Sequence, residues 1–329
     1  MSSDQLRPPI VVRAEGPVLE RVLDATYPAS HHGLSRRAFA TADAAHRKTA
    51  WAPVHERRYA LVHGPSVLAS AQRYELSGMF AGRPLRICGI GGLWGDPTEG
   101  DANHVRVLVD YLVDEARQNA TDVAIVFAAP GSTLPALDGF EIIPTRDVEL
   151  SVAESSRYGA PMTLVRGGED RDLAAIVAMG TARATPFRFH LVRDADFVRY
   201  AMTKKRLLAG LVPSGARQLL FVIAEEGITA AAYAVISSAG GTWTIEECGD
   251  RDPSGARVGA ILQALIAREP VERRPVIRGW LPPGFVPPQV TIVSAQQSDE
   301  ILLARALSPS FGTFAVACPD VLYWRSDFF

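Results

Sequence analysis

The chain has 329 residues, a length that fits two domains of ordinary size. Hydrophobic residues make up 47% and charged residues 21%, which is typical of a globular protein and excludes a mainly disordered one. With 34 basic and 36 acidic residues the formal net charge is −2, so we expect no overall attraction to nucleic acid or to an anionic membrane.

Cysteine usage and apolar runs bear on the compartment. The three cysteines, Cys88, Cys248 and Cys318, are too few and too scattered for a disulfide framework or a zinc cage. No apolar run approaches the roughly 20 residues that span a bilayer, and the opening residues MSSDQLRPP lack the apolar core of a signal peptide. We therefore expect a cytoplasmic protein that holds no metal.

In the first half, residues 9–13 predict a strand, and a long helical region follows to about Trp51. A strand pair is predicted for residues 58–63 and 66–74, because the turn between them contains Gly-Pro. A Gly-rich apolar run, residues 85–94, predicts the next strand and ends in the turn Gly95-Asp-Pro-Thr-Glu-Gly100-Asp-Ala102. The helix after this turn is predicted by apolar residues at helical spacing, namely Val105, Leu108, Val109, Leu112, Val113 and Ala116. Residues 122–128 then read as a further strand.

The second half repeats this order. Residues 162–166 predict a strand, residues 170–179 and 194–209 predict helices, and residues 219–224 and 230–236 predict a strand pair. The strand 242–248 ends in Gly249-Asp-Arg-Asp-Pro-Ser-Gly255-Ala256, and a helix follows with Val258, Ile261, Leu262, Leu265 and Ile266 on one face. Gly100 and Gly255 lie about half a chain length apart, so a domain duplicated in tandem is the simplest account.

The repeat suggests a division at the small, polar segment 155–161, with one domain over residues 1–155 and the other over residues 156–329. A unit of strand, turn, helix and strand buries its helix on one face of a sheet. The expected fold class is therefore α/β (α+β), with a central mixed β-sheet flanked by helices in each domain.

The order of elements in residues 9–153 resembles the GNAT superfamily of acyl-CoA-dependent N-acetyltransferases. The resemblance rests on the strand Ile87-Cys-Gly-Ile-Gly-Gly-Leu-Trp94, on the Gly100-Asp-Ala102 turn and on Leu137-Asp-Gly-Phe-Glu-Ile-Ile143. Residues 160–329 resemble the same fold more weakly, and Val321–Phe329 is similar to the final strand of tandem members. The resemblance implies that acetyl-CoA or another acyl-CoA is the co-substrate and that a small-molecule amine is the acceptor.

The glycine turn has a physical reason to bind such a donor. Backbone N–H groups at a helix N-terminus lack intrahelical partners and carry the positive end of the helix dipole, so they can hold a pyrophosphate if small residues allow its approach. The family motif Arg/Gln-x-x-Gly-x-Gly/Ala is matched at Gly100 and Ala102, whereas Pro97 stands at its first position. The residues expected to bind acyl-CoA are Leu93, Trp94, Gly95, Glu99, Gly100, Asp101, Ala102 and Asn103.

The residues of both turns can also be explained as helix starts that bind no ligand. Asp and Ser/Thr are good helix N-caps, so Asp-Pro-Thr/Ser-x-Gly is a competent helix start by itself. Asp96, Glu99 and Asp101 surround the first turn with negative charge. In the second copy Gly255 fits the motif but Arg257 occupies the next small position, so the second domain is predicted to be degenerate.

The resemblance implies direct attack of an amine on the thioester. Backbone N–H groups around Leu93 and Trp94 would stabilise the oxyanion, Ser132 would protonate the leaving thiolate, and Glu75 would act as the base. The C-terminal carboxylate of Phe329 is a further candidate, because tandem relatives can bring their C-terminus to the active site. Further candidates for the base are Tyr74, His104, His31 and His32, and for each a surface or capping role is the alternative.

Other enzyme classes lack their motifs. The sequence contains no G-x-G-x-x-G opening a helix, no P-loop and no G-x-S-x-G elbow. Two hypotheses remain. The chain is an acyl-CoA-dependent N-acetyltransferase, or it is a tandem binding protein that has lost acyl-CoA and holds another small ligand.

Overall fold

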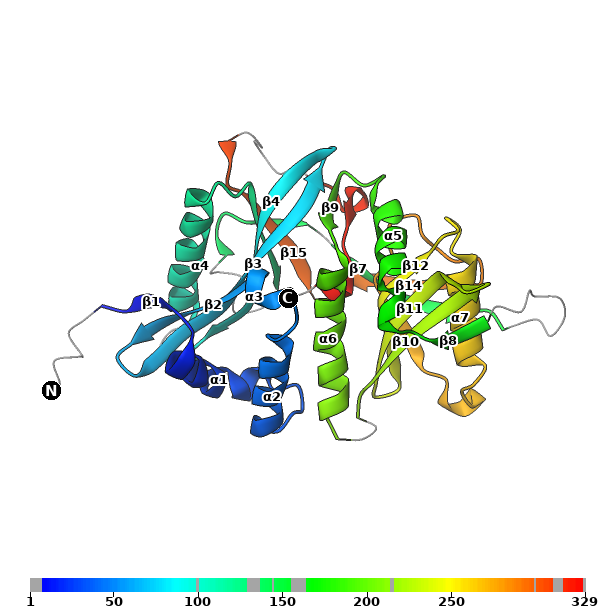
Figure 1. Cartoon of the computed structure of the whole chain (residues 1–329), viewed down its shortest axis with the longest axis horizontal. Helices are drawn as coiled ribbons and strands as arrows, with labels where there is room; N and C mark the ends of the chain where they lie inside the picture. Colours follow the sequence, from blue (N-terminus) through cyan, green and yellow to red (C-terminus); the bar gives the residue numbers. More distant parts are fainter. Residues whose placement is uncertain are drawn as a thin grey trace. The chain divides into compact units, whose positions relative to one another are not determined.

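The structure is a computed structural model that describes residues 8–98, 101–128, 137–143, 145–154, 164–213, 216–298, 300–309 and 316–327. These residues form two compact units, each made of two stretches of sequence. Unit 1 takes its residues from 8–145 and 300–318, and unit 2 takes its residues from 146–298 and 319–327. Each unit is built around one β-sheet (Figure 1).

The sheet of unit 1 has the strand order β1-β2-β3-β4-β5-β15-β6. Its strands are β1 (Ile10–Arg13), β2 (Glu56–His63), β3 (Ser66–Phe80), β4 (Arg83–Gly95), β5 (Val123–Ala128), β6 (Glu141–Ile143) and β15 (Ile301–Ala306). Its helices are α1 (Gly16–Ser30), α2 (Arg36–His46), α3 (Ala52–His55) and α4 (Asp101–Gln118). The pairing of β4 with β5 is parallel and the other pairs are antiparallel, so the sheet is mixed.

Alternate residues of β2 face opposite sides of this sheet. Tyr59 and Leu61 belong to the core cluster that includes the buried face of α4, and Ala60 and Val62 belong to the cluster that includes Val22 of α1. The period of two in the strand therefore places α4 on one face of the sheet and α1 on the other. The apolar residues predicted for α4 are all buried, and burying each large one contributes roughly 1.5–3 kcal/mol.

The sheet of unit 2 has the order β14-β7-β13-β12-β11-β10-β8. Its strands are β7 (Arg146–Val152), β8 (Leu164–Gly167), β10 (Gln218–Glu226), β11 (Thr229–Ala239), β12 (Thr242–Asp250), β13 (Val276–Gly279) and β14 (Val290–Gln297). The unit also contains the helices α5 (Leu173–Ala184), α6 (Ala195–Leu211) and α7 (Ala256–Ile266) and the 3₁₀ turns η3 (Asp170–Asp172), η4 (Val271–Arg273) and η7 (Arg325–Asp327). β9 (Phe189–Val192) pairs in parallel with β16 (Val321–Leu322).

The two halves of the chain exchange one strand. β7 follows β6 in sequence, yet it lies between β13 and β14 in the sheet of unit 2. β15 follows β14 in sequence, yet it lies between β5 and β6 in the sheet of unit 1, where its orange ribbon contrasts with the cyan strands in Figure 1. Residues 301–304 of β15 are all buried, as expected for a strand covered on both faces. The compact units therefore differ from a contiguous division at residues 155 and 156.

The final strand predicted for Val321–Phe329 is wrong over most of its length. Only Val321 and Leu322 form a strand, and the chain then turns into η7. The Asp327 carboxylate accepts a hydrogen bond from the Trp324 N–H at 2.9 Å, which closes this turn. The Tyr323 ring stacks on Trp280 at a centroid distance of 4.5 Å, so the aromatic residues anchor a turn in unit 2.

Candidate functional site

Strand β4 contains a β-bulge in its Gly-rich segment. Gly91 pairs with Gln72 and Trp94 pairs with Ser70, so Gly92 and Leu93 together lie opposite one residue of β3. Gly92 has φ +56°, and a Cβ at this position would come within 3.1 Å of the Gln72 Oε1 atom. The backbone conformation therefore favours glycine here, and a side chain would also have to displace the Gln72 carboxamide.

The bulge marks the point where β4 and β5 stop pairing. Their ladder runs from Ile87 with Val123 to Ile90 with Val126. β5 pairs with β15 along the whole of its other edge, from Val123 to Ala128. Within the described residues, the β5-facing edge of β4 from Gly91 to Gly95 has no ladder partner. Backbone N–H and C=O groups on such an edge are available to a ligand.

Helix α4 begins six residues after β4 ends. It has 18 residues, so its first N–H groups carry the positive end of a full helix dipole. In the turn before it, Asp96 Oδ1 accepts hydrogen bonds from the Thr98 N–H at 2.9 Å and the Thr98 hydroxyl at 2.7 Å, which lowers the pKa of Asp96. This carboxylate is thus engaged within the turn.

The structure brings three of the expected acyl-CoA residues to the bulge. Leu93 packs on the core cluster beneath α4, Trp94 packs on the cluster beneath α1, and Gly95 pairs with Ala69. Asp101 and Asn103 belong to the first turn of α4, and Asn103 is exposed. Glu99 and Gly100 lie outside the described residues, as do the side chains of Asp101 and Ala102.

Glu75 is not brought to the bulge. It pairs with Cys88 and lies three residues along β3 from Gln72, which corresponds to about 10 Å. Its side chain is 59% exposed and lies 3.9 Å from Arg73, which pairs with Glu115 of α4, so it belongs to the α4 face of the sheet. Ser132 and Phe329 lie outside the described residues.

The other candidates for the base have different surroundings. Tyr74 is buried, and its hydroxyl donates to the Gln72 Oε1 atom. His104 lies in the first turns of α4, and its Nδ1 atom is buried without a hydrogen-bond partner among the described residues. His31 ends α1, and its Nδ1 accepts the Gly33 N–H at 3.0 Å. His32 lies beside it in the same connection between α1 and α2.

Gln72 is the residue next to the bulge that we did not predict. Its carboxamide lies against Gly92 and accepts from Tyr74, whose ring stacks on Trp51 at 6.3 Å. The pair Gly91-Gly92 inside a strand was the available signal, because glycines within strands often mark bulges or close approaches.

Unit 2 contains the counterpart of this arrangement. The ladder between β12 and β13 ends at Ile245 with Gly279, and β12 continues to Asp250 paired with β11 on its other edge. A register shift in the pairing of β11 with β12 leaves Glu246 as the extra residue. Helix α7 follows after Gly255, which has φ +74°. The repeat seen in the sequence is therefore a repeat of this local geometry.

The N-terminus of α7 is occupied by the chain itself. Asp250 Oδ2 accepts hydrogen bonds from the Arg257 N–H at 2.8 Å and the Val258 N–H at 3.3 Å. The Arg257 guanidinium lies 3.3 Å from the same carboxylate. A Cβ at Gly255 would lie 2.7 Å from the ring of Phe285, which covers this turn. A buried carboxylate thus fills the place that a pyrophosphate would need.

The described residues contain neither a metal cluster nor a membrane-spanning helix. No group of three or more His, Cys, Asp or Glu side chains there is arranged to hold a metal ion. Likewise, none of the described helices combines the length and apolarity needed to cross a membrane.

Comparison with known proteins places this geometry in a known fold. No family model and no curated protein matches the sequence. A GCN5-related N-acetyltransferase from Kribbella flavida superposes with TM-score 0.63 and 17% identity, over 91% of this chain and 71% of that one. Another from Anabaena variabilis gives TM-score 0.62 and 7% identity, over 92% and 74%. Saccharomyces cerevisiae N-myristoyltransferase with bound myristoyl-CoA gives 0.53 and 9%, over 92% and 84%.

At these identities the likeness establishes the fold. The chain has the fold of the GCN5-related N-acetyltransferases, with two GNAT-like units that each contain a mixed sheet flanked by helices. The predicted fold class and resemblance are therefore confirmed.

Proposed function

We propose that the chain is an acyl-CoA-dependent acyltransferase in which unit 1 binds the donor and an amine of a small molecule is the acceptor. One observation carries the proposal. β4 has a glycine bulge and, among the described residues, an edge without a ladder partner at the point where it leaves β5, and an 18-residue helix begins six residues later. A thioester carbonyl and a diphosphate each need backbone N–H donors, and these two elements supply them.

The residues of unit 1 have separate roles in this proposal. N–H groups between Gly92 and Gly95 donate to the thioester oxygen and stabilise the charge that develops on it. N–H groups from Asp101 onward hold the diphosphate. Gly92 is exposed and has no side chain, so it does not obstruct the approach of the acyl group.

The self-capped helix of unit 2 supports the choice of unit 1. Displacing Asp250 would remove the acceptor of the Arg257 and Val258 N–H groups, while the Arg257 guanidinium would keep its contact with Glu226 at 2.9 Å. Removing a buried carboxylate from its hydrogen-bond donors is costly, because those donors lose their partner. We propose that unit 2 is a degenerate copy that does not bind acyl-CoA.

A binding protein without transferase activity is the second candidate. Pro97 in place of Arg or Gln and the acidic residues around the first turn favour it. Calorimetric titration with acetyl-CoA and with longer acyl-CoA esters separates the two candidates. Saturable binding followed by CoA release in the presence of an amine supports the transferase. Absence of heat up to near-millimolar acyl-CoA contradicts it.

Gly92→Ala is the matched test of the bulge. The added Cβ meets Gln72 at a backbone φ of +56°, so we expect transfer to fall at least tenfold. Gly64→Ala is the control, because Gly64 has the same φ of +56° but a Cβ there meets nothing within 4 Å. The proposal fails if both variants keep full activity or lose it equally.

A further inference from the structure

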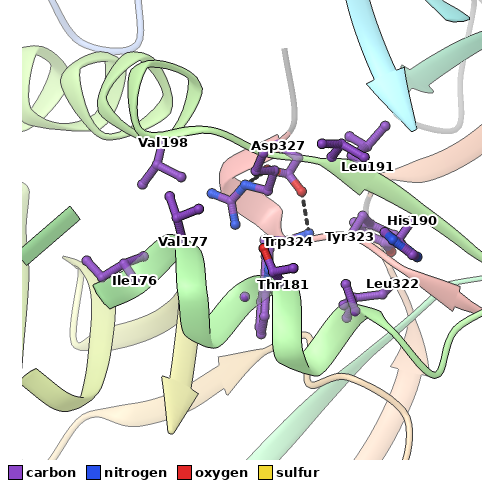
Figure 2. Close-up of a pocket in the computed structure, with 14 residues that line it drawn as sticks. Ile176, Val177, Thr181, His190, Leu191, Val198, Leu322, Tyr323, Trp324 and Asp327 are labelled. Atoms are coloured by element: carbon purple, nitrogen blue, oxygen red, sulfur yellow. Dashed lines mark hydrogen bonds and ion pairs between the residues drawn. The ribbon is translucent and has the colours of Figure 1, made fainter. Parts of the chain in front are cut away.

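A small pocket of about 60 Å³ lies within unit 2 (Figure 2). It is bounded by α5, β9, the first turn of α6 and the C-terminal residues 322–327. Most of its wall is apolar, formed by Ile176, Val177, Leu191, Val198 and Leu322. The polar side chains that reach it are Thr181, His190, Arg193 and Asp327. A site with an apolar wall and a few polar groups is the usual form of a small-molecule site.

The charged groups beside this pocket do not balance. The Arg193 guanidinium makes two contacts with Glu247, at 2.7 and 2.8 Å, and lies 3.0 Å from Asp327 Oδ1. Lys205 pairs with Glu246 at 2.7 Å and so adds no net charge. The Tyr233 hydroxyl donates to Glu247 at 2.6 Å. Among the described residues, one guanidinium thus faces the two buried carboxylates of Glu247 and Asp327, an excess of one negative charge in these contacts.

Two atoms of this cluster lack hydrogen bonds. Asp327 is 1% exposed, and its Oδ2 accepts the Trp324 N–H. Its Oδ1 and the Arg193 Nε are 3.0 Å apart but not aligned, so both are buried without a hydrogen bond among the described residues. Buried polar atoms are normally satisfied, and an unsatisfied carboxylate oxygen that lines a pocket calls for a donor.

We propose that this pocket binds a small primary alkylammonium ion, with the ammonium group donating to Asp327 and the alkyl group against the apolar wall. Such an ion supplies both the positive charge and the donors that the cluster lacks. Burial lowers the pKa of His190, so this side chain adds no competing charge near neutral pH. A carboxylate or phosphate ligand would meet the excess negative charge.

The volume sets the size of the ligand. An apolar cavity of about 150 Å³ holds benzene, with six carbon atoms. A pocket of about 60 Å³ therefore takes two or three non-hydrogen atoms, which corresponds to methylammonium or ethylammonium. n-Butylammonium is too long, so it serves as the size control.

The first experiment measures the unfolding temperature of the full chain in ethylammonium chloride at millimolar concentrations. We expect a saturable rise with methylammonium and ethylammonium and none with n-butylammonium, potassium chloride or ethanol at matched concentration. An equal rise with potassium chloride means a bare cation or a salt effect and overturns the proposal. An equal rise with ethanol means a purely apolar site and overturns it as well.

The second experiment fills the pocket without touching its charges. Gly180 lines the pocket, and a Cβ added there meets nothing within 4 Å, so Gly180→Leu should fold and lose at least tenfold in affinity for ethylammonium. Gly210→Leu in α6 is the control, because it is also helical with open space around it and lies outside this pocket. Unchanged ethylammonium binding by Gly180→Leu contradicts the proposal, as does equal loss in both variants.

The pH dependence gives an independent readout. Burial, with a contribution from the Glu247 charge, raises the pKa of Asp327 to about 6. Arg193, the Trp324 N–H and Lys205 act in the opposite direction. Ethylammonium binding should therefore weaken as the pH falls below about 6, where Asp327 becomes neutral, and Asp327→Asn should abolish this dependence. Affinity that stays constant from pH 8 to pH 5 would mean that Asp327 does not hold the ligand. None of these three measurements uses acyl-CoA, so their outcomes are separate from the test of the proposed transferase.

Discussion

Gly92 and two side chains beside it set the direction of the amides in the β4 bulge. Gln72 lies against Gly92, and the buried Tyr74 hydroxyl donates to the Gln72 carboxamide. Because Tyr74 is 1% exposed and stacked on Trp51, it holds Gln72 in one orientation. We therefore expect Tyr74 and Gln72 to act as positioning residues for the N–H groups that meet the thioester.

Tyr74→Phe tests this positioning role by removing only the Tyr74 hydroxyl. We expect kcat for acyl transfer to fall roughly tenfold, about the worth of one net hydrogen bond, with acyl-CoA affinity within about twofold. Tyr59→Phe is the matched control, because Tyr59 is also buried but donates to Glu115 on the α4 face. Steady-state kinetics and calorimetry on both variants measure the difference. A similar loss of kcat in Tyr59→Phe would point to general destabilisation.

Asp327 is a buried acid whose ionisation the fold opposes. Its pKa is about 6 in the folded protein and about 3.9 in an unfolded chain, so the folded state binds more protons between these values. Stability from this group is thus greatest below pH 4 and falls as the pH rises to 6. Relative to Asp327→Asn, the unfolding free energy should drop by about 2 kcal/mol between pH 4 and pH 7. Urea denaturation at each pH measures it, and a constant difference would contradict the assignment.

At the scale of elements, α4 and α7 begin in the same way but differ in what holds their first N–H groups. Asp250 caps α7 through two N–H groups, whereas Asp96 before α4 is engaged with Thr98. The two helices therefore arise from one pattern in the sequence but differ in this carboxylate contact. The difference lies in where one carboxylate is directed.

Asp250→Ala should lower the unfolding free energy by about 2 kcal/mol, because it removes a helix cap and leaves Arg257 without its buried partner. Asp252→Ala is the control from the same turn, since Asp252 Oδ1 accepts the Ser254 N–H at 2.9 Å, which lies before α7. Chemical denaturation compares the two variants. Equal effects would mean that Asp250 is not the dominant cap.

At the scale of the whole molecule, the exchange of β7 and β15 joins the two halves of the chain. β15 fills the place between β5 and β6, and pairs residues that are more than 170 positions apart in sequence. Closing such long loops loses chain entropy before the strand pairs form and stabilise the sheet, so we expect slow folding. Neither half contains all the strands of its own sheet.

Separate fragments test this consequence. Residues 1–155 and 156–329 expressed alone should each fail to fold, because β5 and β13 would each lose a neighbouring strand. Expressed together they should form a stable complex, and deletion of residues 300–307 from the second fragment should abolish it. Co-purification and circular dichroism are the measurements. A well-folded 1–155 fragment by itself would contradict the importance of the exchange.

Much of this protein follows from its sequence alone. Periodicity gave the helix α4, the strand pairs of both halves and the repeated turn, because a period of 3.6 or 2 is a local property of the chain. The resemblance carried by the Gly-rich strand and the turn led to the right fold. The predicted general base did not meet the bulge, because Glu75 lies three residues along β3 from Gln72, about 10 Å away.

Tertiary structure decided the rest. Which sheet receives β7 and β15 depends on pairing between distant segments, and nothing local in Arg146–Val152 or Ile301–Ala306 marks a partner. The approach of Gln72 to Gly92 depends on the register between β3 and β4, and the burial of Asp327 beside Arg193 depends on where the C-terminal turn packs. The sequence determined which elements form, since their hydrogen bonds and periodicity are local. Only the folded chain determined which charges and amides are left without partners, since that depends on contacts between residues far apart in sequence.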